Sequence, residues 1–106
     1  MTETPTIDWT GNAGKKYRYW IYEIGTSFVA KPGNYIFAKQ TKPNTWRPIY
    51  IGQTSDLSER LENHNEMPCI KRNGGTHIHV HVNSDDEALL AEERDLISYW
   101  PPVCNG

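Results

Sequence analysis

The sequence predicts an α+β fold in which a small three-stranded, mostly antiparallel sheet is flanked by helices. Apolar and polar residues alternate strictly over residues 77–82, which is typical of a strand. Two further strand-like segments, 34–39 and 47–52, are joined by a loop that carries a Pro-Asn pair, as in a hairpin. Two helix-start signals follow the hairpin. The resulting order of strand, strand, helix, strand, helix favours a sheet with helices packed on it.

This unit is expected to span residues 33–106 and to follow an N-terminal extension, residues 1–32. Residues 1–14 carry Pro, Thr, Gly and Asn without periodicity, so we expect a loose lead-in there. Residues 17–24 are aromatic and β-branched, which favours one extra strand. The length of 106 residues corresponds to one domain.

The first helix is expected to begin at Asp56. Glu59 follows Asp56 by three residues, which is capping-box spacing, and the helix should run to about His64. Residues 66–76 contain Pro68 and a glycine pair, so we expect a loop between this helix and the next strand.

The second helix is expected to begin at Ser84, which forms another capping box with Glu87. It should continue to about Trp100, because the two prolines that follow cannot extend a helix.

Charge alone gives a mixed indication of the partner. The formal net charge is −2, which weighs against nucleic acid because phosphate binding depends on Lys and Arg. A local basic patch can still bind phosphate, and cations cluster in two places: Lys15, Lys16 and Arg18, and Lys71 with Arg72.

The two cysteines, Cys69 and Cys104, are too few for a disulfide framework. The first residues are polar, and no stretch has the character of a signal peptide or the length of a membrane span. We therefore expect a cytoplasmic protein with reduced thiols and no membrane partner.

Alternation along the hairpin brings two tyrosines to one face. The following apolar residues are expected to face the core: Ile36, Ala38, Ile49 and Ile51. Tyr35 and Tyr50 then lie together on the other face, where two phenols can line a concave surface. The alternative is that both are ordinary strand residues with a polar tip.

Arg60 and His64 lie four residues apart and are expected to share one face of the first helix. Arg60 can hold a phosphate oxygen with its planar guanidinium, and His64 can hydrogen-bond or carry a proton. The alternative is that Arg60 only pairs with Asp56, four residues before it.

Glu93 is the most informative carboxylate on the second helix. Its four nearest neighbours on the same face are apolar: Leu89, Leu90, Leu96 and Ile97. A carboxylate in such a stripe is costly unless it is paired or bound to a metal, and Mg²⁺ suits it. The alternative is that Glu93 lies at the rim of the stripe or pairs with a nearby Arg or Lys. Glu92 and Asp95 are expected on the flanks as solvated charges.

His77, His79 and His81 occupy one face of the last strand. Because a row on one strand splays its rings, we expect a solvated or DNA-facing surface here. Zinc binding is the less favoured alternative, since structural zinc sites need four well-placed ligands.

In order along residues 33–105, these features resemble the GIY-YIG nuclease family. Gly33-Asn34-Tyr35 matches the first family triplet and Tyr50-Ile51-Gly52 the second. The family's later site residues match Arg60, His64, Glu93 and Asn105.

The resemblance implies an endonuclease that uses one divalent metal, Mg²⁺ or Mn²⁺. It implies that a phenolate of Tyr50 or Tyr35 helps to activate water, that Arg60 stabilises the pentavalent phosphate and that Glu93 holds the metal. Asn105 would brace the site. Gln53 departs from the family, since many members carry a lysine there that perturbs the catalytic tyrosine.

The expected function is therefore metal-dependent hydrolysis of DNA phosphodiester bonds. The alternative is a catalytically weak or silent module of the same fold that binds nucleic acid or protein. No second DNA-binding domain is recognisable in the 106 residues, so we expect that the domain either binds DNA weakly alone or works as a homo-oligomer or with a separate DNA-binding partner.

Overall fold

A five-stranded antiparallel sheet forms the centre of the computed structural model, which describes residues 4–62 and 64–105. The strands are β1 (Thr6–Thr10), β2 (Lys16–Glu23), β3 (Gly33–Lys42), β4 (Thr45–Thr54) and β5 (His77–Val82). Their order across the sheet is β1-β2-β5-β3-β4, so β1 and β4 are its edges.

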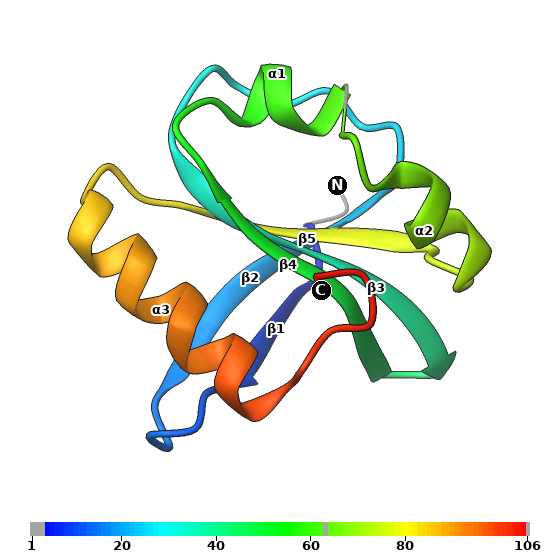
Figure 1. Ribbon diagram of the computed structural model, residues 1–106, viewed down its shortest axis with the longest axis horizontal. Coiled ribbons are helices and arrows are strands. Elements are labelled where there is room, and N and C mark those ends of the chain that lie inside the picture. Colours follow the sequence, from blue (N-terminus) through cyan, green and yellow to red (C-terminus); the bar gives the residue numbers. More distant parts are fainter. Residues whose placement is uncertain (1–3, 63, 106) are drawn as a thin grey trace.

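Helices cover both faces of this sheet (Figure 1). They are α1 (Leu57–Glu62), α2 (Met67–Arg72) and α3 (Asp86–Tyr99). Figure 1 shows α1 and α2 on one side, here called the helix-pair face, and α3 on the other, here called the α3 face. None of these helices has the length and apolar character needed to cross a membrane.

The predicted α+β class is confirmed, but the prediction of three strands is wrong. Residues 16–23 form the extra strand that the sequence favoured, whereas Thr6–Thr10 were expected to be irregular and form β1. This five-residue strand carries little periodicity of its own. It is ordered by antiparallel pairing with β2, in which Trp9 lies opposite Tyr17.

The predicted loop at 66–76 contains helix α2. Pro68 lies in the first turn of α2, where its missing N–H is not needed, so it marks a helix start rather than a loop.

The first predicted helix is shorter than expected, because α1 ends at Glu62, before His64. Asp56 does cap α1, since its Oδ1 accepts the backbone N–H of Ser58 at 3.0 Å.

The second predicted capping box is displaced by one residue. Asp85, not Ser84, precedes α3, and its Oδ1 accepts the backbone N–H of Ala88 at 3.1 Å. The helix ends at Tyr99 with Trp100 as its C-cap, as the two following prolines predict.

Each face of the sheet has its own buried core. The core on the helix-pair face comprises Tyr35, Phe37, Ile49, Leu57, Ile70, Ile78, Val80 and Cys104. The core on the α3 face comprises Trp9, Tyr19, Ile36, Ala38, Ile51 and Leu96.

The prediction that Ile49 and Ile51 share a face is wrong, because the two residues belong to different cores. Phe37 pairs with Tyr50 and Ala38 with Pro48, and this register shift turns Ile49 to the helix-pair face.

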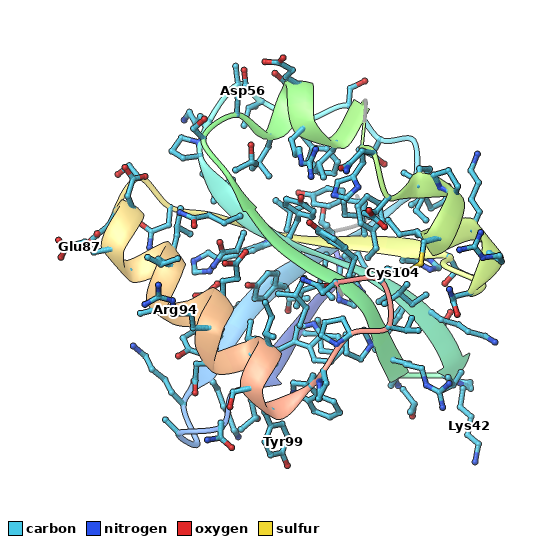
Figure 2. All side chains as sticks on the ribbon, in the orientation of Figure 1. Lys42, Asp56, Glu87, Arg94, Tyr99 and Cys104 are labelled. Carbon is cyan, nitrogen blue, oxygen red and sulfur yellow. A yellow bond between two sulfur atoms is a disulfide. The ribbon has the colours of Figure 1, made fainter. Side chains whose placement is uncertain are left out.

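The prediction of reduced thiols is also wrong, because Cys69 and Cys104 form a disulfide (Figure 2). The two residues are 35 positions apart, but α2 and the C-terminal segment pack into the same core on the helix-pair face. Sequence spacing alone does not reveal this proximity.

Helix α3 is fixed to the sheet by a buried carboxylate. Glu92 is only 5% exposed, and its Oε2 accepts hydrogen bonds from Tyr19 Oη at 2.6 Å and from Asn34 Nδ2 at 2.9 Å. Its Oε1 lies 3.0 Å from His81 Nδ1. Burial alone would raise the pKa of Glu92, but these hydrogen bonds outweigh it and hold the pKa below the ordinary value of 4.5.

Asp95 and Trp100 attach the rest of α3 to the N-terminal strands. Asp95 accepts hydrogen bonds from Tyr17 Oη at 2.8 Å and from the N–H of Ala13 at 2.9 Å. Trp100 Nε1 donates to the carbonyl of Thr10 at 2.9 Å. The expectation that Glu92 and Asp95 are solvated flank charges is wrong, because the N-terminal extension supplies partners that α3 alone does not reveal.

We expect Tyr19→Phe to lower the free energy of unfolding by about 1.5–3 kcal/mol, because it removes a buried hydrogen bond to a charged group. The matched control is Tyr22→Phe on the same strand, whose hydroxyl has no hydrogen bond within residues 4–62 and 64–105. That control should change stability by less than about 0.5 kcal/mol. Urea unfolding measures both, and equal losses would contradict the assigned role of Glu92.

Candidate functional site

Tyr35 lies at the centre of a hydrogen-bonded cluster on the helix-pair face. Its side chain projects from β3 and the residue is only 1% exposed. Its hydroxyl accepts a hydrogen bond from Arg60 Nε of α1 at 3.2 Å. The same hydroxyl lies 2.9 Å from Nε2 of His64, which follows α1. Three of the predicted site residues therefore meet at one phenol oxygen.

The backbone fixes the tautomer of His64. The N–H of Glu66 donates to His64 Nδ1 at 3.1 Å, so this nitrogen carries a lone pair. The proton of the neutral ring is then on Nε2, and it points to Tyr35. Burial and the nearby Arg60 charge lower the pKa of His64 to about 4, which keeps the ring neutral at physiological pH.

The two donors do not make Tyr35 acidic. Burial raises the pKa of Tyr35 well above its ordinary value, and the Arg60 hydrogen bond only partly opposes this effect. Interaction with Tyr50 raises the pKa further. Tyr35 is therefore a neutral phenol at physiological pH.

Tyr50 completes the group from β4. Its ring is stacked on that of Tyr35, with centroids 6.0 Å apart and an interplanar angle of 13°. It lies edge-to-face with His64, with centroids 4.6 Å apart. Tyr50 is half-buried, so unlike Tyr35 it remains accessible to solvent. Tyr35, Tyr50, Arg60 and His64 are called the tyrosine cluster below.

Gly52 makes the position of Tyr35 possible. Gly52 lies opposite Tyr35 in the β3–β4 pairing. A Cβ atom at position 52 would lie 2.6 Å from both Cζ and Oη of Tyr35, which is closer than side-chain atoms approach one another. The third residue of the Tyr50-Ile51-Gly52 triplet therefore has a steric reason to be glycine.

The alternative pairing of Arg60 with Asp56 is wrong. Asp56 caps α1 through its own side chain, and the described chain places no carboxylate within ion-pair distance of Arg60. Arg60 uses Nε to bind Tyr35 and also interacts with Tyr50, and its remaining guanidinium N–H groups have no carboxylate partner in the described chain. It lines a small cavity of about 200 Å³ together with Thr54, Ser55 and two acidic residues, Asp56 and Glu59. Its guanidinium can donate to an oxyanion there, although the two carboxylates make the cavity itself unfavourable for a second negative charge.

Asn105 binds the edge strand rather than the cluster itself. Its Oδ1 accepts the N–H of Ile51 at 2.8 Å, and its Nδ2 donates to the carbonyl of Ile51 at 2.7 Å. The side-chain amide thus pairs with β4 as a neighbouring strand would, directly beside Tyr50 and Gly52.

Glu93 is not brought into contact with the tyrosine cluster. It lies on α3, which packs on the other face of the sheet, and it is half-buried. Glu92 and Asp95 bind β2 and its turn, so helical periodicity places Glu93 on the opposite flank of α3, toward β4. Within the described chain Glu93 has no hydrogen bond or ion pair, and partial burial raises its pKa.

The expectation of a solvated or DNA-facing histidine strand is wrong. His79 is fully buried and its Nδ1 accepts a hydrogen bond from Trp9 Nε1 at 3.0 Å. His81 is bound to Glu92, and His77 packs against Trp46. No group of three or more metal-binding side chains occurs in the part of the chain that the structure describes, so zinc has no ligand cluster here.

Asn34 is the important residue that sequence reasoning did not identify. It occupies the middle of the first triplet, and it is fully buried on the α3 face. Its Nδ2 donates to the carbonyl of Leu89 and to Glu92, both at 2.9 Å. An asparagine at an alternating position of an apolar strand is the sequence signal that could have indicated this role.

Comparison with solved structures finds a similar fold in a nuclease domain. The chain is 26% identical to the GIY-YIG N-terminal endonuclease domain of UvrC from Thermotoga maritima, with a TM-score of 0.60. The match covers 74% of this chain and 86% of that domain. That structure is a Tyr→Phe point mutant bound to its catalytic divalent cation, and a second such mutant matches with 25% identity and a TM-score of 0.60. Comparisons with protein families and with curated proteins gave no match.

We expect stability to fall as the pH is lowered from about 6.5 toward 4. Burial lowers the pKa of His64 to about 4 and that of His79 to about 3, so the unfolded chain binds protons that the folded chain does not. Each ring then costs up to about 1.4 kcal/mol per pH unit. Glu92, whose pKa is lowered, adds a further loss below about 4.5.

Urea unfolding at several pH values measures this slope. His64→Gln should reduce the slope between pH 6 and 4.5 by about half, because one of the two buried rings is removed. A free energy of unfolding that stays constant over this range would contradict the neutral state of both imidazoles.

Proposed function

We propose that this chain, which has the GIY-YIG fold, is a metal-dependent endonuclease that hydrolyses DNA phosphodiester bonds. The observation that carries the proposal is the tyrosine cluster, in which the Arg60 guanidinium is held beside two phenols, one on β3 and one on the edge strand β4. The likeness to a UvrC domain bound to its catalytic cation supports the same chemistry here.

Arg60 is proposed to bind the scissile phosphate. Its Nε is fixed on Tyr35, so the guanidinium is oriented before the substrate arrives. The remaining N–H groups can donate to phosphate oxygens, whose charge grows as water adds to phosphorus. His64, with its proton on Nε2, is a positioning residue that holds the Tyr35 hydroxyl from the other side.

Tyr50 is proposed as the phenol that takes a proton from the attacking water. The structure favours it over Tyr35 because Tyr35 is buried, accepts two hydrogen bonds and has a raised pKa. Tyr50 is half-buried and its ring lies beside Arg60 and His64. As the pKa of an ordinary tyrosine is about 10, Tyr50 needs the neighbouring positive charge to act near neutral pH.

Glu93 is proposed to hold the divalent cation, Mg²⁺ or Mn²⁺. A half-buried carboxylate without a protein partner among the described residues fits a cation, and one carboxylate completed by water and phosphate is enough for Mg²⁺. When bound, the cation supplies charge stabilisation to the phosphate and the leaving oxygen. Asn105 is proposed to keep Tyr50 and Gly52 in place through Ile51.

The second candidate is a silent or weak module of the same fold that binds nucleic acid or protein. The separation of Glu93 from the tyrosine cluster favours it, because the carboxylate and the phenols lie in different layers. The proposal further includes a cytoplasmic location and action as a homo-oligomer or with a separate DNA-binding partner.

Nicking of supercoiled plasmid in Mg²⁺ or Mn²⁺ tests the enzyme function. We expect Arg60→Ala and Glu93→Ala each to lower the rate by about 100-fold or more, because each removes charge stabilisation of the transition state. The matched controls are Arg94→Ala and Glu87→Ala, exposed residues of α3 that should retain activity. DNA binding without cleavage in either metal would favour the second candidate.

The two tyrosines are expected to differ as single phenylalanine variants. Tyr50→Phe should lower the cleavage rate by about 10²-fold or more with little loss of stability, as for removal of a general base. Tyr35→Phe should lower stability as well, because its buried hydroxyl binds both Arg60 and His64. Single-turnover rates and urea unfolding separate the two effects. Full activity of Tyr50→Phe would assign the base elsewhere.

A further inference from the structure

A second cavity, lined by aromatic side chains, lies outside the tyrosine cluster. It has a volume of about 440 Å³ and lies between the β3–β4 turn, the end of α3 and the C-terminal segment. Its wall includes three aromatic residues and one cation: Trp46, Tyr99, Trp100 and Arg47. No carboxylate lines it within the part of the chain that the structure describes. The volume lies in the range of small-molecule and nucleotide sites.

The aromatic walls are held in place from behind. Trp100 donates its Nε1–H to the carbonyl of Thr10 and packs edge-on against Trp9, with centroids 5.5 Å apart. Trp46 packs edge-on against His79, with centroids 4.6 Å apart. The walls are therefore preformed, and the N-terminal strand β1 contributes to fixing them.

Tyr99 and Arg47 are the exposed members of this cavity. Tyr99 is 51% exposed although its ring lies edge-on against Trp100, with centroids 5.0 Å apart. Figure 2 shows Tyr99 at the outer surface of the molecule. Arg47 is also exposed, and its side chain has no ion-pair partner in the described chain. An aromatic face and a free guanidinium at one cavity can bind a planar base and its phosphate.

Positively and negatively charged residues gather at different ends of the molecule, and the cavity lies at the positive end. Segments 24–55, 67–82 and 96–105 contain no acidic residue. They contribute these cations to the end of the molecule with α2 and the β3–β4 turn: Lys39, Lys42, Arg47, Lys71 and Arg72. Acidic residues gather at the start of α3, and Figure 2 shows Glu87 and Lys42 at opposite ends of the view.

We infer that this cavity binds an unpaired nucleotide of a DNA strand, with the base against Tyr99 and Trp46 and the phosphate on Arg47. The inference rests on the proposed function for the choice of DNA. Arg47 and Tyr50 are three residues apart on β4, about 10 Å along an extended strand, which a DNA strand covers within a few nucleotides. The cavity would thus hold a base a few nucleotides away from a phosphate at the tyrosine cluster and would direct the enzyme to DNA with a single-stranded segment.

Fluorescence anisotropy in EDTA tests binding separately from cleavage. The probes are a fluorescein-labelled dT 15-mer, an abasic strand of the same length and a 15-bp duplex. Tyr99→Ala should weaken binding of the dT 15-mer by about 5- to 150-fold, as for loss of one stacked base, and should change binding of the abasic strand by less than about twofold. Arg47→Gln should reduce the slope of log K against log salt by about 0.7 for the single strand.

The matched controls lie elsewhere on the surface. Arg94→Gln on α3 and Trp20→Ala on β2 remove an exposed cation and a partly exposed aromatic ring outside the cavity, and should each change binding by less than about twofold. Circular dichroism confirms folding of every variant. Wild-type affinity for the dT 15-mer in both Tyr99→Ala and Arg47→Gln overturns the inference. Equal losses for the dT 15-mer and the duplex also overturn it, because they indicate phosphate binding only.

The plasmid assay keeps this inference apart from the proposed function. If cleavage depends on Arg60 but the cavity variants bind the dT 15-mer as the wild type does, the cavity inference is wrong and the proposed nuclease function stands. Loss of single-strand binding in the cavity variants without any cleavage supports the cavity site and overturns the nuclease.

Discussion

The buried carboxylate of Glu92 is the constraint on which the rest of the structure depends. It joins β2, β3 and β5 to α3 through Tyr19, Asn34 and His81, in a core where an unpaired charge would be strongly destabilising. Because three donors on three strands converge on one carboxylate, the rotation of α3 about its axis is fixed. That rotation determines which side of the helix turns toward β4.

The sheet divides the chemistry of the molecule into two layers. The phenols and the guanidinium lie on the helix-pair face, where burial of Tyr35 strengthens its hydrogen bonds while Tyr50 remains accessible to solvent. The carboxylate of Glu93 belongs to the opposite layer. The edge strand β4 contributes to both layers, with Ile49 in one core and Ile51 in the other, and the amide of Asn105 covers its backbone at Ile51. The position of Tyr50 therefore depends on both helical layers and on the C-terminal segment.

The hairpin, the strand with three histidines and, to within one residue, the starts of α1 and α3 could be predicted from local signals, because alternation and capping act over a few residues. The convergence of Tyr35, Tyr50, Arg60 and His64 could be expected from strand and helix periodicity together with the family pattern. What could not be predicted depended on partners distant in sequence. The burial of Glu92 and the disulfide of Cys69 require segments far away along the chain, and β1 is ordered by its pairing with β2 rather than by a pattern of its own.

The contact between Gly52 and Tyr35 couples two positions of the sequence. The missing side chain of one residue is the space that the ring of the other fills, so neither position can vary on its own without a clash or a void. Their mutational effects should be strongly non-additive. In related proteins that have lost Tyr35, the space beside position 52 can hold a side chain. Paired changes at these two positions would therefore mark relatives in which the tyrosine cluster no longer has its role.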